Sequence, residues 1–310
     1  MVTILLFPGQ GSQKVGMTRD LYESFGAARL ALQQIDDELS TSLTSLMWEG
    51  PEADLTLTHN AQPAILAHSA AVLAALGDRM GPIAAAAGHS LGEYSAWMAA
   101  GALKAADAAV LVRRRGALMY EAGRARPGAM AAVLGLDTAI VERCCADVTA
   151  GGVGVAVAAN QNAPDQTVIS GDPDAVAQAG DACRGAGAKR VLPLKVSGAF
   201  HSPLMESAVG GLRDALDVAP FGEPRFPVCA NATAELVDNR DDAIRLLGDQ
   251  LTAPVRWVAS MQRLAAEFPG ARWLEIGPGT TLTGLLKRIV PGATCTPLGT
   301  AADIDAFLAA

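Results

Sequence analysis

Few side chains of this 310-residue chain are charged or aromatic: 18% and 5%, against 50% that are hydrophobic. Such an apolar fraction excludes an intrinsically disordered chain. The 17 prolines and 32 glycines follow no fixed period, which excludes a collagen-like or coiled-coil rod. No uninterrupted apolar run approaches the ~20 residues that span a bilayer, so we expect no membrane association. The length suits one large domain or two modest ones.

Cysteine and positive charge are also scarce. The five cysteines include no CxxC pair, so neither a zinc site nor a disulfide framework is expected, and no metal is predicted. The net charge of −8 argues against a nucleic-acid partner, because phosphate contacts need a basic face. The segment 1–8 lacks the basic flank and cleavage site of a signal peptide, so we expect a cytoplasmic protein.

Strand-like apolar runs alternate with longer helical patterns, which is typical of an α/β protein. The first strand runs into a glycine-rich turn at 8–12, and no repeat or long linker interrupts the chain. The expected elements of the larger part are strands 3–7, 83–87 and 273–276 and helices 63–76, 90–100, 105–121 and 282–290.

The middle of the chain has a different pattern, β-α-β-β-α-β, which is the order of a ferredoxin-like fold. A small domain inserted into a larger α/β domain is therefore predicted. The expected elements of this insertion are strands 129–134, 154–158, 166–170 and 190–194 and helices 137–146 and 172–185.

The most informative segment is Gly-His-Ser-Leu-Gly at 88–92, between a predicted buried strand and a predicted helix. A GxSxG in that setting is typical of a nucleophile elbow, which exposes the hydroxyl of Ser90 at a helix N-terminus. The amide of Leu91 can there stabilise a developing oxyanion. An ordinary strand-to-helix turn is the alternative interpretation.

A serine nucleophile needs a base, and the chain has only four histidines. We expect structural or surface roles for His59 in a polar turn, His68 inside a helix and His89 beside the serine. By elimination, His201 in the loop 196–205 is the candidate base. No histidine follows it, whereas an α/β-hydrolase places its histidine late in the chain after an acid. This order disfavours a lipase or esterase.

Arg115 supplies the clue to the substrate. Positions 108, 111, 112, 115 and 119 form one helical stripe, and the two arginines just before residue 115 fall off it. An arginine on a buried face needs an anionic partner. An internal salt bridge is one interpretation, and a fork that binds a substrate carboxylate through two hydrogen bonds is the other.

Taken in order, these motifs resemble the malonyl-CoA:acyl carrier protein transacylase family. The segments that carry the resemblance cover nearly the whole chain: 7–13, 62–64, 88–95, 115–116, 128–131, 160–164, 198–202, 250–255 and 275–279. The resemblance implies an α/β-hydrolase-like core, formed by 1–127 and 199–310, with a ferredoxin-like insertion at 128–198. It also implies malonyl-CoA and an acyl carrier protein as partners, no cofactor, and a role in fatty-acid chain elongation.

The resemblance further implies the residues of the site. Ser90 would attack the thioester of malonyl-CoA and carry the malonyl group until the phosphopantetheine thiol takes it, in a ping-pong mechanism. His201 would be the base and then the acid. The amides of Gln10 and Leu91 would form the oxyanion hole, and Arg115 would hold the malonate carboxylate.

Four further residues receive roles by the same resemblance. A backbone carbonyl near Gln250 would orient the histidine in place of a triad acid. The ring of Phe200 would leave little room for an α-methyl group. Asn160 and Gln62 would line the acyl pocket, although turn-capping and local hydrogen bonding are equally open for these two.

Other functions use the same residues. A free-standing malonyl acyltransferase of a polyketide synthase or of a malonate-processing complex is the close alternative. A serine hydrolase and a non-catalytic carrier-protein docking module are the alternatives from other classes. Because carrier proteins are acidic, we expect a local basic landing site at one of three pairs: Lys189-Arg190, Lys287-Arg288 or Arg113-Arg114.

Overall fold

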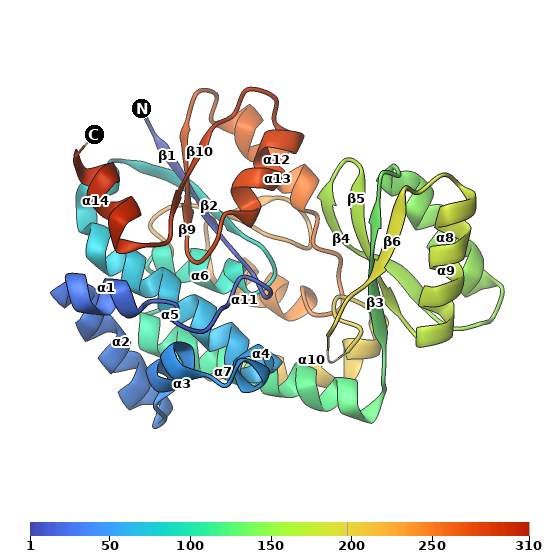
Figure 1. The fold of residues 1–310 in the computed structure, drawn as a ribbon, viewed down its shortest axis with the longest axis horizontal. Helices are drawn as coiled ribbons and strands as arrows, with labels where there is room; N and C mark the ends of the chain where they lie inside the picture. Colours follow the sequence, from blue (N-terminus) through green and yellow to red (C-terminus); the bar gives the residue numbers. More distant parts are fainter. Residues whose placement is uncertain (197, 310) are drawn as a thin grey trace.

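A computed structural model describes residues 1–196 and 198–309, so Ser197, in the predicted insertion, and Ala310 lie outside the described residues. The chain forms an α/β protein with two separate sheets, one of six strands and one of four (Figure 1). Among the described residues, no helix combines the length and the apolar character that crossing a bilayer requires.

The larger sheet has the order β10-β9-β1-β2-β7-β8. Neighbouring strands are parallel except for β8, which is antiparallel to β7. Its strands are β1 (Thr3–Phe7), β2 (Ile83–Gly88), β7 (Val228–Cys229), β8 (Leu236–Val237), β9 (Arg272–Ile276) and β10 (Cys295–Leu298).

Helices cover both faces of this sheet, which explains why β1 is apolar at nearly every position. Side chains alternate along the strand, so Leu5 and Phe7 join the core formed with α5, while Ile4 and Leu6 pack with α12 and α13. The helices of the larger part are α1 (Arg19–Ser24), α2 (Gly26–Leu39), α3 (Leu43–Glu49), α4 (Glu52–Thr56), α5 (Thr58–Leu76), α6 (Gly92–Ala99), α7 (Ala105–Ala125), α10 (Glu206–Val218), α11 (Arg240–Asp249), α12 (Trp257–Glu267), α13 (Thr281–Ile289) and α14 (Ala301–Ala309).

The smaller sheet is antiparallel with the order β4-β5-β3-β6, which confirms the predicted ferredoxin-like arrangement. Its two helices pack on one face through a separate core that includes Val133, Val141 and Val176. The predicted boundaries at 128 and 198 stay a prediction. The elements are β3 (Ala129–Leu134), α8 (Thr138–Ala150), β4 (Ala156–Ala163), β5 (Gln166–Gly171), α9 (Pro173–Gly185) and β6 (Arg190–Pro193).

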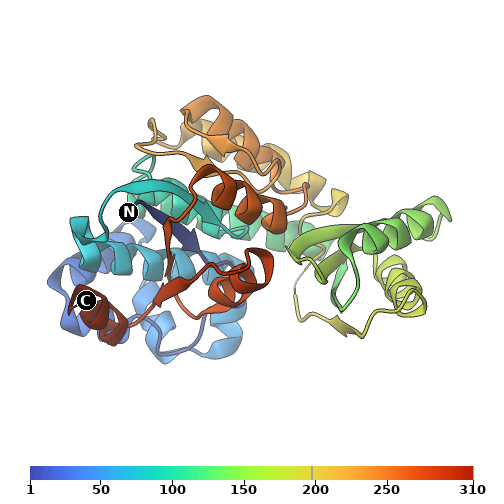
Figure 2. The ribbon, with the colours of Figure 1, turned by 90° about the horizontal axis from the view of Figure 1, so that it is seen from above.

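The smaller unit projects from one side of the larger one, as the view from above shows (Figure 2). Its strand β4 is hydrogen-bonded to the segment that follows α11. The amide of Gln161 donates to the carbonyl of Val255 over 2.9 Å, and the amide of Val255 donates to the carbonyl of Ala159 over 2.8 Å. This bridge places the middle of β4 beside the loop that carries Gln250.

Among the predicted elements that differ from the observed ones, three contain residues discussed for the site. Pro63 lies inside α5, which begins at Thr58, because burial along this helix outweighs the hydrogen bond that proline removes. His59 is therefore helical and not in a turn. The helix predicted at 90–100 begins at Gly92, since Ser90 has a left-handed backbone with φ of 51°. Strand β4 extends to Ala163 because its polar residues pair with both β5 and Val255.

Candidate active site

Ser90 lies on a tight turn between β2 and α6 that only glycine can flank. A Cβ on Gly88 would stand 1.8 Å from the backbone carbon of Gly92, and a Cβ on Gly92 would stand 2.1 Å from the carbonyl oxygen of Phe7. Ser90 itself has φ of 51°, a conformation that costs free energy and is found where the surroundings enforce it. The structure therefore contains the strained, glycine-flanked turn that the sequence predicts.

His201 lies against this serine. Its Nε2 is 2.7 Å from Ser90 Oγ, and its Nδ1 donates to the carbonyl oxygen of Gln250 over 3.0 Å. Because a carbonyl only accepts, Nδ1 carries the proton and Nε2 is left to accept from the serine hydroxyl. Burial, and next the charge of Arg115, lower the pKa of His201 to about 3. The imidazole is thus neutral at physiological pH, which is the state that a base requires.

Two backbone amides border the cavity in front of Ser90. Gln10 and Leu91 both line it, and their backbone N–H groups donate to no acceptor in the described part of the chain. Leu91 directly precedes α6, where the partial positive charge of the helix favours an anion. An oxyanion hole requires free amides of this kind, and that role of Gln10 and Leu91 stays a prediction.

Arg115 is 1% exposed and has no carboxylate partner among the described residues. Its Nη1 donates to Gln62 Oε1 over 2.8 Å. Its Nη2 donates to Gln250 Oε1 over 2.9 Å and to Ser90 Oγ over 3.2 Å. The internal salt bridge considered from the sequence is therefore absent from the part of the chain that the structure describes. A buried cation held by neutral oxygens beside the nucleophile is the arrangement that a carboxylate ligand would complete.

These residues surround one cavity of about 320 Å³. Gln62 bonds across to α7, and Asn160 lies in β4, so neither serves as a turn cap. Gln250 stands behind the cavity and contacts its residues through hydrogen bonds. The predicted site residues that line it are Gln10, Gln62, Ser90, Leu91, Arg115, Asn160, Phe200 and His201.

Sequence reasoning missed three residues of the site. Asn231 Oδ1 accepts from the amide of Ser90 over 2.7 Å, and Asn231 Nδ2 donates to the carbonyl of Gly88 over 2.7 Å. Glu93 is buried beneath the same turn, and Lys195 lines the cavity. Glu93 lies within the elbow segment 88–95, but nothing in a single sequence pairs Asn231 with a serine 141 residues away.

The other histidines have structural contacts. His68 is bound between Thr18 Oγ1 and the carbonyl of Gly299, at 2.9 and 2.8 Å, and burial lowers its pKa to about 4. His89 Nε2 lies 2.7 Å from Asn162 Oδ1. The ring of His59 packs edge-on against Tyr120.

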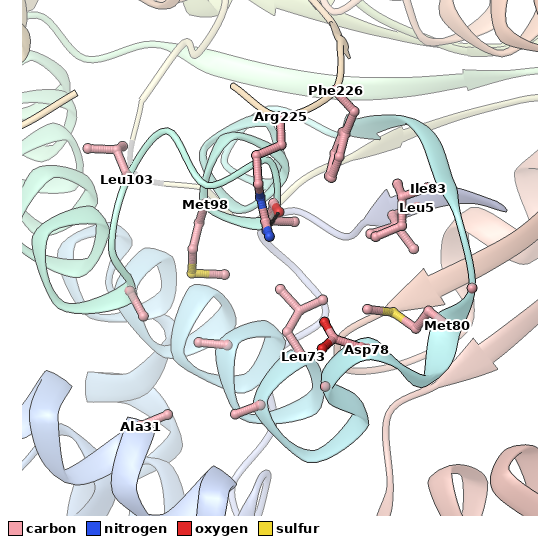
Figure 3. Close-up of a pocket in the computed structure, with 16 residues that line it drawn as sticks. Leu5, Ala31, Leu73, Asp78, Met80, Ile83, Met98, Leu103, Arg225 and Phe226 are labelled. Carbon is pink, nitrogen blue, oxygen red and sulfur yellow. Dashed lines mark hydrogen bonds between the residues drawn. The ribbon is translucent and has the colours of Figure 1, made fainter. Parts of the chain in front are cut away.

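A second cavity, of about 540 Å³, lies near the start of β2, at the other end of that strand from Ser90 (Figure 3). Its walls are mostly apolar, with the polar ends of Asp78 and Arg225 on different sides. The described residues that line it include no serine, histidine or cysteine, so it lacks the serine and histidine pair of the first cavity.

Comparison with known proteins agrees with the motifs. The acyl transferase domain family matches residues 4–304. Over 284 residues the chain is 45% identical to the malonyl CoA-acyl carrier protein transacylase of Bacillus subtilis (strain 168), covering 92% of this chain and 89% of that protein. The chain belongs to the malonyl-CoA:acyl carrier protein transacylase family. The Escherichia coli (strain K12) member is 41% identical over 305 residues, with 98% and 97% of the two chains covered.

Solved structures of this family share the whole fold. The acyl carrier protein S-malonyltransferase of Vibrio cholerae superposes with a TM-score of 0.94 at 39% identity, over 99% of both chains. A malonyl-transacylase in complex with its type II PKS acyl-carrier protein gives 0.93 at 39% identity, over 100% of this chain and 99% of that one. The fold and family predicted from the sequence are confirmed.

Proposed function

We propose that this transacylase transfers a malonyl group from malonyl-CoA to the phosphopantetheine thiol of an acyl carrier protein, for fatty-acid chain elongation, through a malonyl-Ser90 intermediate. One observation supports this most strongly. Ser90 Oγ lies 2.7 Å from a neutral imidazole and 3.2 Å from a buried guanidinium without a carboxylate partner among the described residues. The proposed base and the proposed carboxylate-binding cation thus both contact the hydroxyl of the nucleophile.

The reaction follows in two matched halves. In the first, Ser90 Oγ attacks the thioester carbon while His201 Nε2 takes the hydroxyl proton, and the amides of Gln10 and Leu91 stabilise the oxyanion. The carbon–sulfur bond then breaks, and His201 returns the proton to the departing CoA sulfur. In the second half the carrier thiol gives its proton to His201 and attacks the malonyl ester. The ester carbon–oxygen bond then breaks, and His201 returns the proton to Ser90 Oγ.

The donor is selected by charge and by size. The malonate carboxylate gives the buried guanidinium of Arg115 a charged partner, whereas an acetyl group leaves the cation without one. Phe200, which is 6% exposed, stands directly before His201 and limits the space for a branched acyl group. Gln62 stabilises the guanidinium from its other side.

The carrier protein docks on positive charge that leads to the cavity. Lys189 and Arg190 are both exposed at the start of β6, and the chain continues from this strand to Lys195 at the cavity. Arg288 is already paired with Asp165, and Arg113 donates to Asn60, so the other two predicted pairs offer less free charge. The cytoplasmic location stays a prediction.

A polyketide carrier protein is the second candidate acceptor, because one similar solved structure is a complex with such a carrier. Initial-rate measurements test both the transfer reaction and the identity of the acceptor. We expect parallel double-reciprocal plots for malonyl-CoA and carrier protein, with a higher kcat/KM for a fatty-acid carrier than for a polyketide one. Intersecting plots would contradict the malonyl-Ser90 intermediate, and release of free malonate without transfer to the carrier would contradict the transferase. A reversed preference would assign the polyketide pathway.

A further inference from the structure

Glu93 is a buried carboxylate that forms no salt bridge among the described residues. It lies in the first turn of α6, three residues after Ser90, and is 1% exposed. Its Oε2 accepts hydrogen bonds from Gln250 Nε2 over 2.7 Å and from the amide of Asn231 over 3.0 Å. Burying a carboxylate in this way is costly, and an apolar side chain would fill the space at lower cost.

The first contact of Glu93 determines which way the Gln250 amide faces. The NH₂ group of that amide donates to Glu93 Oε2 and, over 3.0 Å, to the carbonyl of Ser90, while its oxygen accepts from Arg115. Because a carboxylate only accepts, the reverse orientation would place the amide oxygen against two acceptors and its NH₂ group against the guanidinium. The carboxylate therefore keeps the amide oxygen directed at Arg115.

The second contact of Glu93 is with Asn231, which is hydrogen-bonded to the turn that carries Ser90. The Asn231 amide that bonds to the carboxylate belongs to the residue whose side chain brackets Ser90, through the Ser90 amide and the Gly88 carbonyl. A left-handed serine persists only where its surroundings over-determine it. Glu93 thus joins the residue that holds the nucleophile to the residue that holds the guanidinium.

We propose that Glu93 is a positioning residue for donor selection, which acts through the Gln250 amide to keep the Arg115 guanidinium where the malonyl carboxylate binds. The inference rests on the proposed function, in which Ser90 accepts malonyl and Arg115 binds its carboxylate. Burial raises the pKa of Glu93 to about 7, while hydrogen bonds from Asn231 and Gln250 and the charge of Arg115 act in the opposite direction. Assays at pH 8 therefore examine the ionised form.

The test is Glu93→Gln, which keeps the shape but lets the Gln250 amide face either way. We expect the ratio of kcat/KM for malonyl-CoA to that for acetyl-CoA to fall about tenfold, chiefly through a higher KM for malonyl-CoA. In an Arg115→Ala background the same substitution should leave the ratio unchanged, because the residue it acts through is absent. Glu142→Gln, which alters an exposed carboxylate that accepts from Gln161, is the matched control.

Thermal unfolding establishes that each variant is folded, and Glu93→Asp replaces Glu93→Gln if the latter does not fold. The shorter carboxylate should lower the ratio in the same direction. An unchanged ratio in a folded variant would overturn the inference, and so would a fall of equal size in the Arg115→Ala background. The wild-type protein is first tested for formation of a malonyl-enzyme. If none forms, the proposed function itself is wrong, whatever the role of Glu93.

Discussion

Arg115 Nη2 donates a hydrogen bond to Ser90 Oγ over 3.2 Å, although Ser90 stands just before α6 and Arg115 in the middle of α7. The cation proposed to select the substrate therefore contacts the atom proposed to attack it. A short diacid can satisfy both groups at once, with its thioester carbon at Ser90 and its carboxylate at Arg115. We therefore expect donor selection and acylation to depend on the same group of contacts.

Arg115→Ala should lower kcat/KM for malonyl-CoA about 100-fold or more, because a charge-assisted pair with the carboxylate is lost. Activity with acetyl-CoA should change much less, so the gap between the two donors narrows. Arg115→Lys is the control, since it keeps the charge and loses the fork. An unchanged malonyl preference in Arg115→Ala would return this arginine to a structural role.

The reactivity of Ser90 should be nearly independent of pH between about 8 and 5. The pKa of His201 is lowered to about 3, so the imidazole stays neutral over this range and is lost as a base only as the pH falls toward that value. The measurement is the rate of Ser90 sulfonylation by phenylmethylsulfonyl fluoride, which carries no carboxylate and so does not depend on Arg115. His201→Ala gives the background rate. A decline centred near pH 6.5, the ordinary pKa of histidine, would show an unperturbed side chain.

His68 should make the fold less stable in acid. Its pKa is about 4 in the folded protein and has the ordinary value of 6.5 in the unfolded chain, so only the unfolded chain takes up the proton as the pH falls through 6.5. At about pH 5 the loss amounts to about 2 kcal/mol of unfolding free energy. Urea unfolding of wild type and His68→Gln at pH 8 and pH 5 measures this. The stability advantage of the wild type should shrink by that amount at the lower pH, and an equal advantage at both pH values would refute the assignment.

Reversing the charges of Lys189 and Arg190 together should raise KM for the carrier protein about tenfold and leave KM for malonyl-CoA nearly unchanged. The effect should weaken with added salt, because exposed charges are screened. The same reversal at Lys287 and Arg288 is the comparison, with a smaller effect expected because Arg288 already pairs with Asp165. If reversals at all three basic pairs are silent, carrier docking does not depend on these charges.

Local patterns predict where the main residues of the candidate site lie. Ser90 follows from a glycine-flanked turn after a buried strand, and His201 follows from the scarcity of histidine. Helical spacing predicts the buried position of Arg115. The apolar run at residues 3–7 predicts a buried strand, which is β1. Each of these depends on neighbours in the chain or on composition.

The remaining contacts depend on tertiary structure. Asn231 reaches Ser90 across 141 positions, and Gln250 reaches Glu93 across 157, so no local pattern carries either pair. The two-residue strands β7 and β8 are too short to show periodicity. The predicted start of α5 is wrong because burial of Ala61 and Gln62 keeps the chain helical through Pro63.

Intact-mass spectrometry after mixing the protein with malonyl-CoA tests the central claim most directly. The proposed mechanism predicts one added malonyl group on the wild type, none on Ser90→Ala, and loss of the adduct when a holo carrier protein is added. Free malonate accumulating without an adduct would point to hydrolysis. A protein that neither gains the group nor turns over malonyl-CoA would contradict catalysis and leave only carrier binding.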